Sequence, residues 1–361
     1  MSQKIEKFID QIMKEFKFYK ESWNYEDGCI YIGMEDLYNV TGDRKYYNFI
    51  KGNIDKRLND DGTIKNFSIK EYNIDNICSG RVLYTLYDET EEEKYRKAIE
   101  ESYDQLRTHP RNREQSFWHK KIYPDQVWLD GLYMALPFYT EYEKRFDENN
   151  NLKDIFLQFV NVEKNMKDPE TGLYYHGYDE SRKEKWADGI TGRSGNFWSR
   201  AMGWYVMALI DVIEKMGINE NRRRLEKIFS EAVDALMRFQ DEKSGLWYQV
   251  IDKKDNPKNY LETSGSLMII YSVLKGCRLG VLKKDYIEKA EKGFDEIEKN
   301  YLKEKDGEIY LDNICGVAGL GNTPYRDGTE EYYYSERIIP NDYKGVGAFL
   351  MAYSEIIAKN K

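Results

Sequence analysis

The sequence predicts an all-α protein: a closed (α/α)6 barrel of six helical hairpins that occupies residues 1–361 as a single domain. Two features of the pattern predict this fold. Six apolar helix patterns that open with small residues recur along the chain, and charged helices with one apolar stripe lie between them. The chain has only 7 prolines and no linker rich in serine or glycine, so no domain boundary is indicated.

The six apolar helices are the candidates for the inner ring. They are predicted over 28–42, 76–90, 128–142, 199–217, 264–277 and 344–359. A glycine near the start of each helix would let neighbouring helices pack closely: Gly33, Gly80, Gly131, Gly203, Gly265 and Gly347. Outer helices are predicted over 91–107, 221–240 and 283–302, among others. A two-domain helical protein and an open helical solenoid are the alternatives, and the count of six favours the closed ring.

The connections between the helices carry a second repeat. Residues 168–179 (DPETGLYYHGYD) resemble residues 241–252 (DEKSGLWYQVID), and in each a glycine turn precedes alternating β-type residues. This pattern predicts short β-hairpins or extended segments. Residues 73–80 (NIDNICSG) also echo residues 310–317 (YLDNICGV). Such connections would gather at one end of the barrel and form a pocket there.

Composition and charge argue against two classes of protein, nucleic-acid-binding proteins and membrane proteins. The formal net charge is −9, whereas a nucleic-acid-binding protein needs a basic face. No apolar run is long enough to cross a bilayer, and residues 1–19 form a charged amphipathic pattern rather than a signal peptide. We therefore expect a cytoplasmic protein with no membrane or nucleic-acid partner, either a monomer or a weak homo-oligomer.

Metal and cofactor sites are not indicated. The four cysteines, Cys29, Cys78, Cys277 and Cys315, form no C-x-x-C pair, and the chain has only three histidines. We expect reduced, buried thiols and neither a metal nor another cofactor.

A carboxylate lies where one apolar helix begins. Asp130 lies within YPDQVWLDGLYMALPFY (123–139), close to Trp128, and Asp75 lies five residues before Gly80 in the preceding unit. Adjacent units would bring the two carboxylates together at the mouth of the barrel. Paired carboxylates in an aromatic pocket are typical of glycoside chemistry, although an isolated Asp at a helix start is more often an N-cap.

Other polar and aromatic candidates lie in the same connections. They are His119 and Lys120 in FWHKKIYP, His176 in GLYYHGYD, and Trp198, Arg200 and Trp204 in GNFWSRAMGW. Arg200 begins an apolar helix and needs an anionic partner, for which Asp75, Asp188 and a substrate carboxylate are the candidates. His109, in a polar turn before a proline, is expected to be structural.

Two long segments resemble a known family. HPRNREQSFWHKKIYPDQVWLDGLYMALPF and GLYYHGYDESRKEKWADGITGRSGNFWSRAMGWYVMAL are similar to the unsaturated rhamnogalacturonyl hydrolases of glycoside hydrolase family 105 and, more distantly, to the unsaturated glucuronyl hydrolases of family 88. The resemblance runs from about Trp23 to the C-terminus and implies an (α/α)6 barrel. It implies a small oligosaccharide substrate, produced by a lyase, with a 4,5-unsaturated galacturonic acid at the non-reducing end, usually on rhamnose. Hydration of the C4=C5 double bond would release that sugar.

The resemblance also implies a role for each candidate residue. Asp130 matches the general acid/base, and Asp75 matches a second carboxylate that holds substrate hydroxyls and favours the protonated form of Asp130. The implied substrate-binding residues are His119, Lys120, Met134, His176, Trp198, Arg200 and Trp204, with Trp23 or Tyr25 as a stacking ring. No metal is implied.

Two other functions stay open. One is an ordinary two-carboxylate glycosidase that acts on intact oligosaccharides, which activity on saturated substrates would reveal. The other is a non-catalytic carbohydrate-binding protein, in which Asp130→Asn would leave sugar affinity nearly intact and there would be no turnover to lose.

Overall fold

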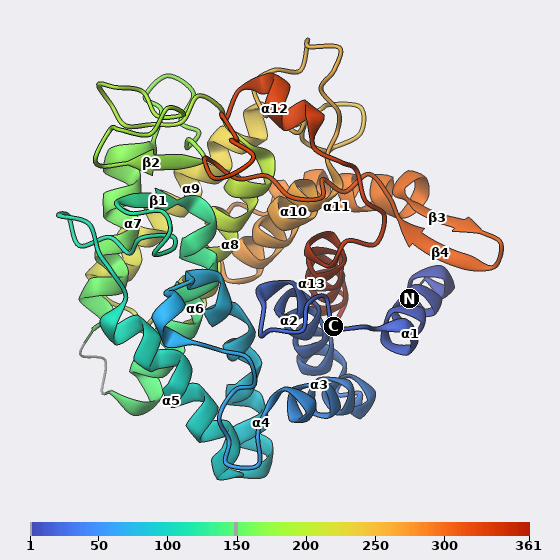
Figure 1. The fold of residues 1–361 in the computed structure, drawn as a ribbon. Coiled ribbons are helices and arrows are strands. Elements are labelled where there is room, and N and C mark those ends of the chain that lie inside the picture. Colours follow the sequence, from blue (N-terminus) through green and yellow to red (C-terminus); the bar gives the residue numbers. More distant parts are fainter. Residues whose placement is uncertain (1, 148–150) are drawn as a thin grey trace.

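The computed structural model describes residues 2–147 and 151–361, and helices dominate it (Figure 1). The α-helices are α1 (Gln3–Glu15), α2 (Tyr25–Thr41), α3 (Arg44–Arg57), α4 (Leu83–Thr90), α5 (Glu93–Thr108), α6 (Leu129–Phe146), α7 (Leu152–Met166), α8 (Ser199–Lys215), α9 (Glu220–Arg238), α10 (Thr263–Arg278), α11 (Tyr286–Glu296), α12 (Glu330–Ser335) and α13 (Tyr343–Lys359). The remaining elements are the helices η1 (Ile69–Glu71), η2 (Ile74–Val82) and η3 (Ile297–Tyr301) and the strands β1 (Gln126–Trp128), β2 (Gly177–Asp179), β3 (Leu302–Lys305) and β4 (Glu308–Leu311).

The apolar helices form a closed inner ring. Going round the ring, α2 contacts η2, η2 contacts α6, α6 contacts α8, α8 contacts α10, α10 contacts α13, and α13 returns to α2. Helix α4 continues η2, so the ring uses all six predicted apolar segments. These helices are buried over most of their circumference, as expected of the inner layer. The predicted (α/α)6 barrel is confirmed.

The charged helices form the outer layer. Helices α3, α5, α7, α9 and α11 each contact the inner helix that precedes them in the chain. The start of the chain supplies a further outer helix, α1, whose Phe8 ring lies edge-on to Phe349 of α13 at 5.6 Å. Each outer helix buries a single stripe. In α5 this stripe contains Tyr95, Ala98, Ile99, Ser102, Tyr103 and Leu106, which lie three or four residues apart.

Glycines allow the inner helices to approach closely. A Cβ atom on Gly347 would lie 2.4 Å from the carbonyl oxygen of Cys29, and one on Gly265 would lie 2.8 Å from the backbone of Ser199. These gaps are too short for any side chain. At these two positions a glycine is therefore required for the inner helices to pack as closely as they do.

The connections gather where the inner helices begin. Strands β1 and β2 pair antiparallel, with Val127 opposite Tyr178, and so join two successive connections instead of forming a local hairpin. Strands β3 and β4 form a local hairpin that projects beside α1 (Figure 1). The repeat of 168–179 and 241–252 is a shared turn: Gly172 and Gly245 have φ values of +73° and +76°.

The remaining features of the fold are its cysteines, possible metal sites and possible membrane-spanning helices. The four cysteines are buried free thiols. Within residues 2–147 and 151–361, no three His, Cys, Asp or Glu side chains are placed to hold a metal ion. No helix in these ranges is both long and apolar enough to span a membrane.

Candidate active site

A cavity of about 140 Å³ lies at the end of the barrel where the connections gather. Its walls come from the starts of α2, η2 and α6 and from two connections that are distant in sequence. The lining residues are Lys20, Tyr25, Glu26, Asp75, His119, Lys120, Tyr123, Trp128, Asp130, Met134, Val317, Ala318 and Arg326. The two predicted catalytic carboxylates thus share one cavity.

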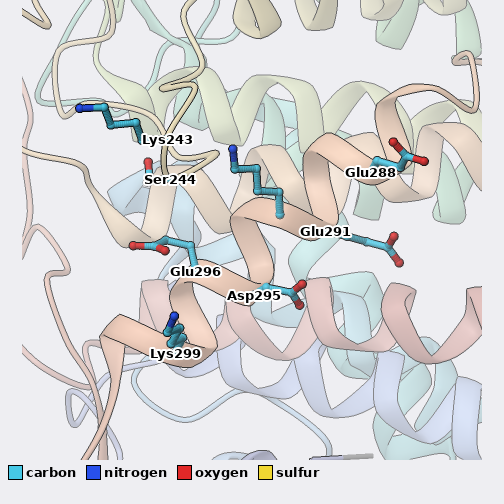
Figure 2. Close-up of a pocket in the computed structure, with 8 residues that line it drawn as sticks. Lys243, Ser244, Glu288, Glu291, Asp295, Glu296 and Lys299 are labelled. Carbon is cyan, nitrogen blue, oxygen red and sulfur yellow. The ribbon is translucent and has the colours of Figure 1, made fainter.

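A larger hollow of about 430 Å³ lies on the outer surface beside α11 (Figure 2). Its lining consists of Lys243, Ser244, Glu288, Glu291, Lys292, Asp295, Glu296 and Lys299. These side chains include no aromatic ring, and the carboxylates of Glu291 and Glu296 point in opposite directions (Figure 2). The hollow lacks a convergent set of groups, so the smaller cavity is the candidate site.

Asp130 lies in the first turn of α6 and faces His176. The Nε2 atom of His176 is 3.3 Å from Oδ2 of Asp130, and neither atom is hydrogen-bonded to any other described group. The pairing of β1 and β2 produces this approach, because the backbone N–H of Leu129 donates to the carbonyl oxygen of His176 at 3.1 Å. His176 is fully buried, whereas the Asp130 side chain keeps 13% exposure toward the cavity.

Asp75 is held as an anion by two neighbours. Its Oδ2 is 2.6 Å from Nζ of Lys120, and its Oδ1 is 3.6 Å from Nε2 of His119. Burial by itself would raise the pKa of Asp75, but the charge and hydrogen bond of Lys120 together with His119 outweigh burial and hold this pKa below its usual value. Burial lowers the pKa of His119 to about 4, so this imidazole is neutral at neutral pH.

Stacked rings form one wall of the cavity. The ring of Trp128 lies parallel to the imidazole of His119 at 4.3 Å and to the phenol of Tyr123 at 4.9 Å. The guanidinium of Arg326 lies 5.8 Å from the Trp128 ring and donates from Nη2 to the Tyr123 hydroxyl at 2.8 Å. An aromatic face beside a cation suits a sugar that carries a carboxylate.

The remaining predicted site residues divide between the cavity and its surroundings. Tyr25 and Met134 line the cavity. Trp198 lies behind it, with its ring 4.8 Å from that of His176. Trp23 and Trp204 are buried outside the cavity: Trp23 donates to the carbonyl oxygen of Asn76 at 2.8 Å, and Trp204 stacks on a core tyrosine.

Arg200 makes its hydrogen bonds to buried groups of the protein itself. Its Nη1 donates to the carbonyl oxygen of Cys315 at 2.6 Å and to the hydroxyl of Ser264 at 3.1 Å, and its Nη2 donates to the carbonyl oxygen of Gly316 at 3.1 Å. The residue is 1% exposed and does not line the cavity. Asp75 and Asp188, the protein partners considered from the sequence, are not its hydrogen-bond partners. Arg200 instead anchors the segment that brings Val317 and Ala318 to the cavity.

This anchoring role predicts a loss of stability. Arg200→Met keeps the length of the side chain but leaves two buried carbonyl groups without donors. We expect the free energy of unfolding, measured in urea, to fall by about 2–4 kcal/mol. The matched control is Arg223→Met, because Arg223 is exposed on α9. Equal stabilities of the two variants would contradict the anchoring role.

Several residues of the cavity were not singled out from the sequence. Lys20 and Glu26 pair across the opening, with Nζ and Oε1 2.6 Å apart. Arg326, which lines the cavity, and Tyr333, which does not, come from the long connection before α13, which has no motif beyond the echo at 310–317. Tyr333 is fully buried, and its hydroxyl oxygen lies 2.8 Å from Nδ1 of His176.

Comparison with known proteins identifies the family of this chain. The model of the family described as Glycosyl Hydrolase Family 88 matches residues 4–359. The chain belongs to Glycosyl Hydrolase Family 88. A solved glycoside hydrolase of family 105 from C. acetobutylicum is 47% identical, with a TM-score of 0.94 over 98% of this chain and 99% of that one. This likeness confirms the resemblance to family 105.

Two other members of this group are more distant. The unsaturated rhamnogalacturonyl hydrolase YesR of Bacillus subtilis is 26% identical over 295 residues, which cover 80% of each chain. The unsaturated glucuronyl hydrolase of Bacillus sp. GL1 shares the fold, with a TM-score of 0.68, 14% identity and coverage of 97% of this chain and 95% of that one. Membership of families 88 and 105 makes this protein a glycoside hydrolase.

Proposed function

We propose that the protein releases a 4,5-unsaturated galacturonic acid from the non-reducing end of short, lyase-generated rhamnogalacturonan oligosaccharides. Asp130 would act as the single general acid and base. The named activity of the Bacillus subtilis relative and the family-105 likeness support this substrate class.

One observation carries the single-carboxylate mechanism. Among the described residues, three carboxylates line the cavity, and lysines pair with two of them: Lys20 with Glu26 and Lys120 with Asp75. A carboxylate held by a lysine is a weak nucleophile and a weak base. In the part of the chain that the structure describes, Asp130 has no lysine or arginine partner and faces a histidine instead. An ordinary glycosidase needs two working carboxylates, whereas hydration of a double bond needs one.

The reaction divides into two proton transfers by Asp130. As the acid it protonates C4, and as the carboxylate it takes a proton from the water that adds at C5, so that Asp130 is regenerated. The resulting C5 hemiketal opens by breaking the bond between C5 and the ring oxygen. C1 is then a hemiacetal of the leaving sugar, and its collapse gives an aldehyde and the free sugar. Asp75 would hold substrate hydroxyls as a fixed anion.

The test follows the double bond directly. Purified protein is mixed with unsaturated rhamnogalacturonan disaccharide, and the ultraviolet absorbance of the C4=C5 bond and the release of rhamnose are recorded together. We expect both signals to change in equal molar amounts. The saturated disaccharide and an unsaturated glucuronyl disaccharide are the comparison substrates. Activity on the saturated sugar would favour the two-carboxylate glycosidase, and no activity on any of them would favour the carbohydrate-binding protein.

Arg326 is the cation that we expect to meet the uronate. Its Nη2 and Nε bond to Tyr123, Leu320 and Gly321, and among the described residues no acceptor is bonded to its Nη1. Arg326→Gln is expected to raise KM for the charged disaccharide by about 10- to 100-fold, since hydrogen bonds to charged groups contribute about 1.5–3 kcal/mol. The methyl ester of the same disaccharide is uncharged, so its KM should change little.

The matched control is Lys183→Gln, which removes one positive charge from an exposed residue outside the cavity. Equal effects of Arg326→Gln on the acid and on the ester would show that Arg326 does not recognise the carboxylate.

A cytoplasmic location fits a final step on imported short oligosaccharides and stays part of this proposal, as does a monomeric or weakly associating state.

A further inference from the structure

Three polar side chains, Tyr333, His176 and Asp130, form a row that leads from α12 to the cavity. The Tyr333 hydroxyl oxygen lies 2.8 Å from Nδ1 of His176, and Nε2 of the same ring lies 3.3 Å from Oδ2 of Asp130. Tyr333 and His176 are both fully buried. The Tyr333 ring also stacks on Trp198 at 6.0 Å, and Trp198 in turn contacts His176. Packing therefore fixes the orientation of the Tyr333 and His176 rings, which lie between α12 and Asp130.

The donors and acceptors in this row of side chains determine which tautomer the neutral His176 ring adopts. Burial raises the pKa of Tyr333 well above its usual value, so the hydroxyl keeps its proton. In the described part of the chain, Nδ1 of His176 is the only bonded partner of this hydroxyl. A buried O–H that does not donate costs free energy, so the hydroxyl donates to Nδ1. Nδ1 then carries no proton, and the neutral ring has its proton on Nε2.

The opposite form would leave two groups unsatisfied. With the proton on Nδ1, the Tyr333 O–H would lack an acceptor among the described residues. The bare Nε2 would then face Oδ2 of Asp130, which is buried and has no hydrogen-bond partner across residues 2–147 and 151–361. While Asp130 is a carboxylate, two acceptors would oppose each other at 3.3 Å. The form with the proton on Nε2 instead sets a donor against Oδ2 at 3.3 Å, and neither of these two atoms has a competing hydrogen-bond partner among the described residues.

We propose that Tyr333 is a positioning residue, which sets the tautomer of His176 and thereby places the acidic proton of Asp130 on Oδ1. An Nε2–H that donates to Oδ2 occupies that oxygen in both protonation states of the carboxyl group. Because Oδ2 is buried, Oδ1 is the oxygen that faces the cavity and the substrate. The same N–H stabilises the carboxylate as Asp130 gives up its proton. This inference rests on the role of Asp130 in the proposed function.

The experiment compares Tyr333→Phe with the wild type in two independent measurements. Tyr333→Phe keeps the ring that packs on Trp198 and removes only the hydroxyl. The first measurement is the ¹⁵N spectrum of protein labelled in its histidine rings, in which protonated and bare ring nitrogens have well-separated shifts. The chain has only three histidines, and His176→Gln identifies the signals of His176. The second is the pair kcat and KM on the unsaturated disaccharide.

The expected results are specific. Wild-type His176 should show a protonated Nε2 and a bare Nδ1, and Tyr333→Phe should shift this ring toward the other tautomer. We expect kcat to fall by about tenfold or more, with KM within about twofold, because the proton rather than the substrate is misplaced. The matched control is Tyr334→Phe on the same helix, whose hydroxyl bonds to Glu330 at 3.2 Å; it should change neither measurement.

Two outcomes would overturn the inference. A protonated Nδ1 in the wild type would reverse the assigned tautomer. An unchanged kcat in Tyr333→Phe would show that the hydroxyl does not assist turnover. Failure of the proposed function is separate, because it would appear as an inactive wild type while the ¹⁵N spectrum still reports the tautomer.

Discussion

Asp130→Asn is expected to reduce kcat by about 100- to 10,000-fold with little change in KM. The amide has the size of the carboxyl group but can neither give a proton to C4 nor take one from water. The other carboxylates of the cavity cannot substitute, because Glu26 and Asp75 are held by lysines at 2.6 Å. Loss of ultraviolet absorbance from the unsaturated disaccharide measures the effect.

Two controls separate this loss of chemistry from a loss of structure. Asp60→Asn makes the same chemical change at an exposed residue outside the cavity and should keep full activity. Calorimetric titration of Asp130→Asn with intact disaccharide should show binding without turnover. A variant that retains turnover within about tenfold of the wild type would remove Asp130 from the role of general acid and base.

The second large effect is expected for Asp75→Asn, which should lower kcat/KM by about 100-fold or more. The loss corresponds to about 2.7 kcal/mol, in the range of hydrogen bonds that a charged group makes. The variant removes an anion that would hold substrate hydroxyls and leaves Lys120 without its partner at 2.6 Å. Steady-state kinetics on the unsaturated disaccharide measure kcat/KM.

The double variant Asp75→Asn with Lys120→Met separates the two causes. If Asp75 contacts the substrate, removing Lys120 as well should restore stability but not activity. Recovery of activity in the double variant would instead assign to Asp75 only the neutralisation of Lys120.

Asp75 also predicts a pH dependence of stability. Its pKa in the folded protein lies below the ordinary value of 3.8, so the ion pair stabilises the folded state above that pH. This contribution should be lost as the pH falls from about 3.8 through the lower folded-state value. Urea unfolding across this range should show the loss in the wild type and its absence in Asp75→Asn.

Part of the site could be predicted from the sequence because its signals are local. Asp130 lies two residues after Trp128 at the start of an apolar helix, and Asp75 lies just before Gly80 at the corresponding place in the preceding unit. Both line the cavity. His119 and Lys120 lie in one short aromatic motif and reach the same cavity. Each of these predictions depended on neighbours a few residues away, which a pattern can show.

Arg200 shows where such reasoning stops. A buried arginine demands acceptors, and the sequence suggested carboxylates for this role. The structure satisfies it with the carbonyl oxygens of Cys315 and Gly316, more than one hundred residues further along the chain. Every residue carries a backbone carbonyl, so the sequence contains no mark of which carbonyl groups will be used.

The sequence by itself determined the ring of six helices, the glycines that close it and the carboxylates at its mouth, because helical periodicity and small residues are local properties. The tertiary structure alone decided which connections meet. The pairing of β1 with β2 brings His176 to Asp130, and the long segment before α13 adds Arg326 and Tyr333. These contacts join residues that are 46 to 203 positions apart, and they depend on how the closed ring aligns its loops rather than on any local pattern.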